Sequence, residues 1–179
     1  MKKITILPLT LCALFAALSV VLSQVVIPMG VVSVVFTQVS FLLAGALLGA
    51  KWGFLSQSLY VAMGAAGLSV FSGFHGGIGW LVGPTGGFLW GYPIAALLVG
   101  WITNKRGTKL PVLIAAMVVG DLIVYLPGVP WLAYVKDITI AQAVAAGMLP
   151  FLPFDAAKIA ISVVLARILC PLLRKYRRT

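Results

Sequence analysis

The sequence predicts an all-α polytopic membrane protein with six transmembrane helices and both termini in the cytoplasm. Of its 179 residues, 62% are hydrophobic and only 9% are charged, which is more apolar surface than one soluble domain can bury. The apolar residues form runs of about twenty, the length that crosses roughly 30 Å of hydrocarbon at about 1.5 Å per residue. These runs are too long and too continuously apolar for barrel strands, so the spanning segments should be helices.

Turn residues divide the chain into these spans, which we expect to form a single membrane domain over residues 1–179. The breaks are Pro28-Met29-Gly30, Lys51-Trp52-Gly53, the glycine-rich stretch 72–83, the basic turn 104–109 and a long connection at 128–150. That connection looks partly helical around residues 140–146. In chain order, the predicted spans are residues 8–27, 33–50, 53–71, 81–103, 109–126 and 151–173.

Basic residues set the orientation of these helices. Lys2 and Lys3 precede the first span, which is too long for a secretory signal and has no obvious small-residue cleavage site after it, so we predict a retained helix. If six helices alternate, the loops on one side offer only Lys136, next to Asp137. The positive-inside rule then places both termini in the cytoplasm. The basic residues on the cytoplasmic side are Lys2, Lys3, Lys51, Lys105, Arg106, Lys109, Arg174, Lys175, Arg177 and Arg178.

Composition and motifs exclude several classes of function. The net charge of +10 follows from the orientation bias, and no soluble basic surface remains outside the spans, so we expect no nucleic-acid partner. The sequence has no G-x-x-x-x-G-K-[ST] phosphate loop, so an ATP-driven cycle needs a separate ATPase. His75 is the single histidine, and Cys12 and Cys170 lie far apart near cytoplasmic ends. We therefore expect no metal cluster, no Cys/His nucleophile, no structural disulfide and no enzyme.

An aspartate and a lysine one helical turn apart, at the start of the last span, form the best candidate site. The chain has only three acidic residues, and placing Asp155 beside Lys158 in apolar surroundings is costly unless the pair meets something polar. Their i, i+3 spacing puts both side chains on one helix face, where free backbone amides add polar anchoring. The predicted topology opens the pair outward, which favours a binding pocket. The alternative is an ion pair that lets the helix start near the interface.

A glycine-rich segment surrounds the start of the fourth span. Gly83, Gly87 and Gly91 recur every fourth residue and strip one helix face of side chains. Either a neighbouring helix or a flat ligand can then approach the backbone, and the spacing does not separate the two. A flexible loop upstream can serve as a lid over the same face. It carries Phe74, His75 and Trp80 among its glycines.

Two further features lie within the spans. Asp121, in the fifth span, should face protein or water rather than lipid, and its partner is either Arg167 or a pocket group. In the first span, Ala13 and Ala17 form a small-x-x-x-small pair, with Ala16 adjacent. Close packing inside the bundle is the default use of such a pair.

Two motifs together resemble a known family. The first is Gly83-Pro84-Thr85-Gly86-Gly87 followed by Gly91-Tyr92-Pro93; the second is Leu149-Pro150-Phe151-Leu152-Pro153 leading into Asp155 and Lys158. They look like the motifs of the BioY family, the biotin-specific substrate-binding (S) subunits of energy-coupling-factor (ECF) transporters. The segments 42–49 and 67–71 are similar to its second and third helices. Phe74-His75 stand where small residues are usual in the family.

The resemblance implies a six-helix subunit in the plasma membrane of a prokaryote. Such a subunit captures biotin at the extracellular face and works with a transmembrane coupling (T) subunit and two ATPase subunits. The face that carries Ala13 and Ala17 is then expected to dock on the coupling subunit. Biotin is the transported substrate, the lipid bilayer is the surroundings, and no cofactor is implied.

The chemistry of biotin suits the candidate residues. Biotin offers a planar ureido group, an apolar sulfur ring and a carboxylate on a flexible tail, so a tight site needs an acceptor, a cation and aromatic walls. We expect Asp155 to accept from a ureido N–H and Lys158 to donate to the ureido carbonyl or to the carboxylate. For the secondary candidates, ordinary packing is the alternative. These candidates are Thr85, Gly86, Gly87, Tyr92, Gln38 and Trp131.

Two other functions stay open. One is an S component for a different vitamin, and the other is a stand-alone small-solute carrier. Carriers often show inverted repeats with interrupted helices, and a channel lines a continuous path with polar residues. In this sequence the polar groups collect at one end and no convincing internal repeat is present. The pattern therefore favours a receptor-like binding subunit.

Overall fold

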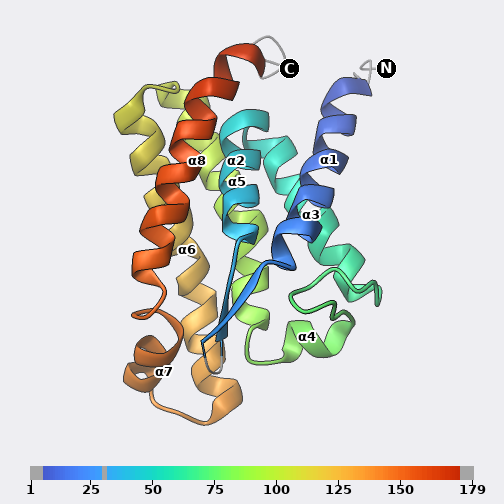
Figure 1. Ribbon diagram of the computed structural model, residues 1–179, viewed down its shortest axis with the longest axis vertical. Helices are drawn as coiled ribbons and strands as arrows, with labels where there is room; N and C mark the ends of the chain where they lie inside the picture. Colours follow the sequence, from blue (N-terminus) through green and yellow to red (C-terminus); the bar gives the residue numbers. More distant parts are fainter. Residues whose placement is uncertain (1–5, 30–31, 174–179) are drawn as a thin grey trace.

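The computed structural model describes residues 6–29 and 32–173, which form eight helices and one two-stranded hairpin. In chain order the elements are α1 (Ile6–Ser23), β1 (Val26–Met29), β2 (Val32–Val35), α2 (Thr37–Leu48), α3 (Ala50–Ala65), α4 (Ile78–Val82), α5 (Gly86–Arg106), α6 (Leu110–Lys136), α7 (Ile140–Gly147) and α8 (Leu152–Leu173). The long helices run side by side, and α1 begins and α8 ends at the same end of the bundle (Figure 1). The hairpin, α4 and α7 lie toward the opposite end.

Four helices, α1, α5, α6 and α8, are long and apolar enough to cross a membrane. The predicted helical membrane architecture is confirmed at that level. The helices α2 and α3 have 12 and 16 residues, so at about 1.5 Å per residue each is shorter than the roughly 30 Å of hydrocarbon. The count of six spans and the cytoplasmic termini therefore remain predictions. The terminal basic residues on which the orientation partly depends, Lys2, Lys3 and those from Arg174 onward, lie outside the described residues.

The central helix of the bundle is α2, and all 12 of its residues are buried. It packs against α1, α3, α5 and α8, so its neighbours separate it from lipid. Its buried polar groups find partners in those neighbours: the hydroxyl oxygens of Ser40 and Ser19 lie 2.8 Å apart, and Ser19 donates to Gln57 Oε1 at 3.1 Å. Because a buried hydroxyl without a partner is costly, this network fixes α1, α2 and α3 relative to one another.

The hairpin corrects the ends of the first two predicted spans. We expected helix to residue 27 and again from residue 33, but α1 ends at Ser23 and α2 begins at Thr37. Between them β1 and β2 pair antiparallel, with Val26 opposite Val35. The segment is rich in valine, and β-branched side chains lose rotamer freedom in a helix and pack well on a strand. An apolar run of this length does not by itself separate the two states.

The ends of three other predicted spans also differ. The helix α3 ends at Ala65 rather than near residue 71, and a loop follows it; α5 begins only at Gly86, after the separate short helix α4. We ended the fifth span at residue 126 because Pro127 follows, yet α6 continues through Pro127 and Pro130 to Lys136. Val129 and Leu132 are buried in this extension, and their packing offsets the hydrogen bonds that the prolines remove. The expected helix near residues 140–146 is confirmed as α7.

Glycines bring α5 and α6 into close contact. A Cβ at Gly87 would lie 2.6 Å from the carbonyl oxygen of Pro127, and one at Gly91 would lie 2.8 Å from the Cα of Val124. Trp131 of α6 donates its indole N–H to the carbonyl of Gly83 at 2.9 Å. Of the two uses left open for the glycine repeat, the structure therefore shows close helix packing.

Gly87→Ala should lower the stability of the folded protein by about 1–3 kcal/mol, because the added methyl group overlaps the α6 backbone. Thermal unfolding of the purified protein in detergent measures the change. Gly79→Ala is the matched control, since a Cβ at Gly79 meets no atom within 4 Å. Equal melting temperatures for the two variants would contradict the close packing of α5 on α6.

Candidate functional site

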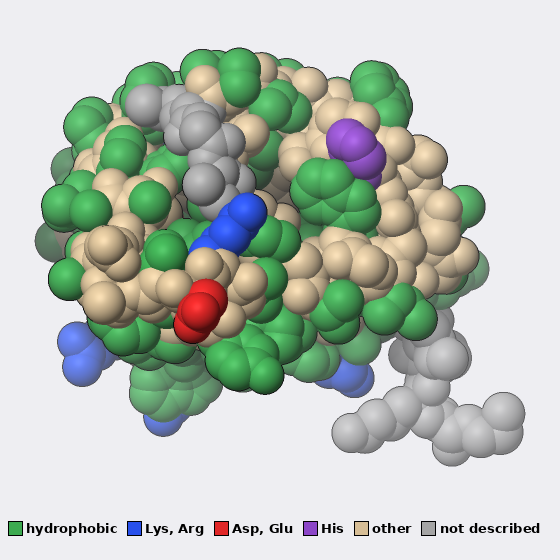
Figure 2. Space-filling model, turned by 90° about the horizontal axis from the view of Figure 1, so that it is seen from below, with side chains coloured by type: hydrophobic (Ala, Val, Ile, Leu, Met, Phe, Trp, Pro, Cys, Tyr) green, Lys and Arg blue, Asp and Glu red, His purple; other side chains and the backbone are tan. Residues whose placement is uncertain are grey.

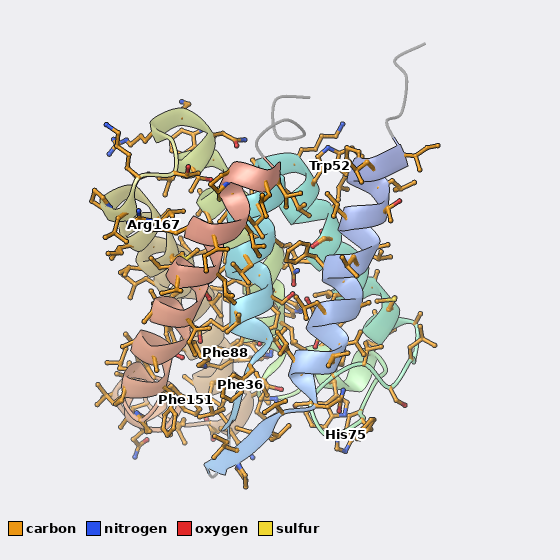
Figure 3. All side chains as sticks on the ribbon, turned by 45° about the horizontal axis from the view of Figure 1, so that its top comes forward. Phe36, Trp52, His75, Phe88, Phe151 and Arg167 are labelled. Atoms are coloured by element: carbon orange, nitrogen blue, oxygen red, sulfur yellow. The ribbon has the colours of Figure 1, made fainter. Side chains whose placement is uncertain are left out.

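A cavity of about 290 Å³ lies between the hairpin and the lower halves of the long helices. The helices α2, α3, α5 and α6 and the strand β2 all contribute to its walls. The end of α1, the start of α8 and the loop that precedes α4 complete them. Phe88, Phe151 and His75 all line the cavity, and in the view of Figure 3 His75 lies to the right of the two phenylalanines. The volume is near the lower end of the about 300–1,000 Å³ typical of small-molecule pockets.

A buried ion pair stands in the wall of this cavity. The Nζ of Lys158 lies 2.9 Å from Oδ1 of Asp155, and the two residues are 5% and 4% exposed. Asp155 also accepts a hydrogen bond from the hydroxyl of Tyr125, and Lys158 donates to the carbonyl oxygen of Val35 at 3.3 Å. The pair thus connects α8 with α6 and with the hairpin. Within residues 6–29 and 32–173, these two contacts leave one of the three ammonium N–H groups for a ligand.

A second carboxylate lines the same cavity. Asp121 is 7% exposed and accepts a hydrogen bond of 2.5 Å from Nε2 of Gln38. The expectation that it faces protein rather than lipid is confirmed, and of its two expected partners the pocket group is the one found. Arg167 is exposed on α8, and it is Gln38 that bonds the carboxylate.

Aromatic rings form much of the remaining wall. Phe41 stacks on Tyr92 with ring centroids 5.0 Å apart, and Tyr60 contacts both Tyr92 at 6.5 Å and Phe71 at 5.7 Å. All four rings line the cavity. Among them the hydroxyl of Thr37 is buried and has no hydrogen-bond partner in the described residues. The cavity can therefore hold a flat, partly apolar molecule and offer it hydroxyl, carboxylate and ammonium groups.

Known proteins are similar to this chain in sequence and in fold. A model of the BioY family matches residues 1–175 of the chain. The chain belongs to the BioY family. A probable biotin transporter BioY of Pyrococcus horikoshii is 40% identical over 157 residues, which are 88% of this chain and 92% of that one. The biotin transporter BioY of Thermotoga maritima is 38% identical over 154 residues, 86% of this chain and 89% of that one.

A solved crystal structure has a similar fold. It is described as the S-component for biotin from an ECF-type ABC transporter, and it matches with a TM-score of 0.88 and 26% sequence identity. The match covers 94% of this chain and 93% of that one. The BioY resemblance given by the two sequence motifs is thereby confirmed, and the named relatives are transporters rather than enzymes.

The structure brings five of the expected site residues to the cavity of this BioY protein. They are Gln38, Thr85, Tyr92, Asp155 and Lys158. The other three expected residues lie in contacts between elements. Gly87 packs on Trp131, whose indole bonds to Gly83, and a Cβ at Gly86 would meet the carbonyl of Leu81. A part for Gly86, Gly87 and Trp131 in binding stays a prediction.

Sequence reasoning missed Tyr125, Tyr60 and the carbonyl of Val35. Tyr125 carries a signal that could have found it, because it follows Asp121 by four residues and so shares its helix face. Tyr60 stands in a run of apolar and small residues that gives no such hint. The carbonyl of Val35 belongs to a strand that the periodicity did not predict.

The structure also places the two cysteines and the small residues of α1 that the sequence singled out. Cys12 and Cys170 are buried thiols that form no disulfide. In residues 6–29 and 32–173, no three His, Cys, Asp or Glu side chains are placed to share a metal ion. On α1, Ala16 is buried in the bundle, whereas Ala13 and Ala17 are exposed on its outer face. The default expectation that Ala13 and Ala17 pack inside the bundle is therefore wrong.

Lys158→Met should destabilise the protein by about 3 kcal/mol or more, because it leaves the buried Asp155 carboxylate without its counter-charge. The double variant Asp155→Asn with Lys158→Met should recover much of this loss. Thermal unfolding measures both, and Lys136→Met, at an exposed lysine, is the matched control. A single variant as stable as the control would show that the pair is effectively solvated.

Proposed function

We propose that this chain is the substrate-capture subunit of a vitamin importer, which binds biotin and delivers it through an ATP-driven ECF complex. The observation that carries the proposal is the buried Asp155–Lys158 pair in the wall of an aromatic cavity. Membership of the BioY family and the likeness to an S-component for biotin support it. Charged groups persist in such an apolar setting when a polar ligand completes their hydrogen bonds.

The cavity offers what the ureido ring of biotin requires. The N–H groups of the ring find acceptors in Asp155, and the ring carbonyl finds a donor in the ammonium of Lys158. The stacked rings of Phe41 and Tyr92 give the bicyclic system a flat apolar surface. This arrangement supplies both the polar contacts that fix orientation and the apolar area that contributes binding energy.

We further infer a topology of six spans in a prokaryotic plasma membrane, with both termini in the cytoplasm and the cavity open to the outside. The described lysines and arginine of the helix connections support this orientation, because they lie at the end of the bundle where α8 ends (Figure 1). These are Lys51, Lys105, Arg106 and Lys109. Lys136 and Asp137 lie at the opposite end, beside α7.

A transmembrane coupling subunit and two ATPase subunits complete the proposed importer. The chain has no phosphate loop of its own, so the energy of ATP must enter through a partner. The exposed Ala13 and Ala17 face of α1 is the proposed docking surface for the coupling subunit. Small side chains there let a partner helix approach closely within the bilayer.

Biotin, but not thiamine, riboflavin or niacin, should raise the melting temperature of the purified chain. A ligand at a hundredfold excess over its dissociation constant stabilises the folded state by about 2.7 kcal/mol.

Lys158→Ala should weaken biotin binding by about a hundredfold or more, because it removes a charged donor from the cavity. Equilibrium binding measures this, with Arg167→Ala, an exposed residue on the same helix, as control.

Stabilisation by another vitamin would show an S component with a different substrate. Unchanged biotin affinity in a folded Lys158→Ala protein would overturn the assignment of the ion pair to the ligand.

Replacing both Ala13 and Ala17 with Trp should abolish ATP-driven biotin uptake and leave equilibrium binding intact, since these side chains point away from the bundle. Uptake into proteoliposomes with the coupling and ATPase subunits measures the loss. Ile168→Trp, on the exposed face of α8, is the matched control and should support uptake. Loss of binding as well would assign the alanines to the bundle. Uptake by the chain alone, without partners or ATP, would show a stand-alone carrier.

A further inference from the structure

The two ends of the cavity differ in charge. At its buried end lie two carboxylates, Asp121 and Asp155, and one ammonium group, that of Lys158. At its exposed end lie the glycine-rich loop and α4, with His75 and Trp80. Of the side chains that line the cavity, only those of Lys158 and His75 can carry a positive charge. The side chain at the exposed end that can carry a positive charge is therefore a histidine, the only one in the chain.

The backbone around His75 holds its ring in place. The chain reverses through Gly73 and Phe74, both with positive φ, of 71° and 59°. The N–H of Phe71 donates to the carbonyl of His75 at 2.8 Å, which closes the turn. The side chain of Gln24, the residue after α1, makes two further hydrogen bonds to this turn. Its Oε1 accepts from the N–H of Phe74 at 2.9 Å, and its Nε2 donates to the carbonyl of Phe71 at 3.1 Å.

The imidazole of His75 has one nitrogen occupied and one left for a ligand. Its Nδ1 lies 2.9 Å from the carbonyl oxygen of Ser72, and because a carbonyl only accepts, Nδ1 carries the hydrogen. The ring lies against Trp80, with centroids 4.4 Å apart. Figure 2 shows this histidine in purple on the surface of the face that holds the hairpin, α4 and α7. With Nδ1 occupied, Nε2 donates to an anion only when the ring is protonated.

Charge decides how a ligand with one anionic end lies in this cavity. At the buried end the single ammonium group of Lys158 already pairs with Asp155, so a ligand carboxylate placed there would meet the Asp155 carboxylate without a counter-charge of its own. A ureido group has no net charge, and its N–H groups suit carboxylate acceptors. We propose that His75 recognises the carboxylate of biotin at the cavity mouth, so that the ureido ring lies inward against Asp155 and Lys158 and the tail points outward. This assignment rests on the proposed function and fixes the end-to-end orientation of its substrate.

The described groups around His75 are all uncharged. They are Gln24, which follows α1, Ser72 and Phe74 of its own turn, and Trp80 of α4. The titratable groups that share the cavity are those of Asp121, Asp155, Lys158, Tyr60, Tyr92 and Tyr125. A comparison of a charged with a neutral ligand tail, in the unmodified protein and in a His75 variant, tests the contact between the histidine and the carboxylate.

The test compares biotin with its carboxamide, in which a neutral amide replaces the carboxylate. His75→Gln should weaken biotin binding about tenfold or more, the worth of one charge-assisted hydrogen bond, and change carboxamide binding less than about threefold. His75→Arg, a permanent cation, should keep the preference for biotin over the carboxamide. Equilibrium binding measures all of these.

Phe74→Asn is the matched control, because it alters the same turn, tolerates the left-handed backbone and leaves the imidazole. It should bind both ligands as the unmodified protein does. Equal losses of biotin and carboxamide in His75→Gln, or no loss of either, would overturn the role of His75 while biotin binding by the unmodified chain stands. An unmodified chain that binds no biotin would overturn the proposed function and this assignment together.

Discussion

The contact between Asp155 and Lys158 is the interaction on which the rest of the site depends. It lies in the first two turns of α8, and its further hydrogen bonds reach Tyr125 on α6 and the backbone of β2. Three elements that are distant in sequence are thereby joined at one buried point. Since both charges have left water, their desolvation is offset only while these partners are in place. The wall of the cavity and the charge within it are thus set by the same four groups.

The inner and outer helices around this pair contribute different residues. The buried α2 supplies Gln38 and Phe41 to the cavity, and the glycines of α5 let α6 come close enough to bring Asp121 and Tyr125 to it. The outer helices carry the long apolar faces. The residues that line the site include aromatic and polar side chains, whereas many of those that face outward are large and apolar.

The sequence predicted the chemistry of the site better than its walls. Asp155 and Lys158 could be found because they are adjacent on one helix and because acidic residues are so few. The partners Val35 and Tyr125 could not be paired with them in advance, since they are 123 and 30 residues away in the chain from the groups they bond. The hairpin was missed because a short run of valines satisfies the pattern of either a buried strand or a helix. The extension of α6 was missed because local proline rules carry no information on the packing of Leu132.

The burial of α2 has a consequence for how the protein meets bilayers of different thickness. A change in hydrocarbon depth acts on helices that touch lipid, which respond by tilting at modest cost. Because every residue of α2 is buried, this helix presents no lipid-facing length that must match the thickness of the bilayer. Mismatch therefore acts on α1, α5, α6 and α8, and it reaches α2 only through the contacts that α2 makes with its neighbours.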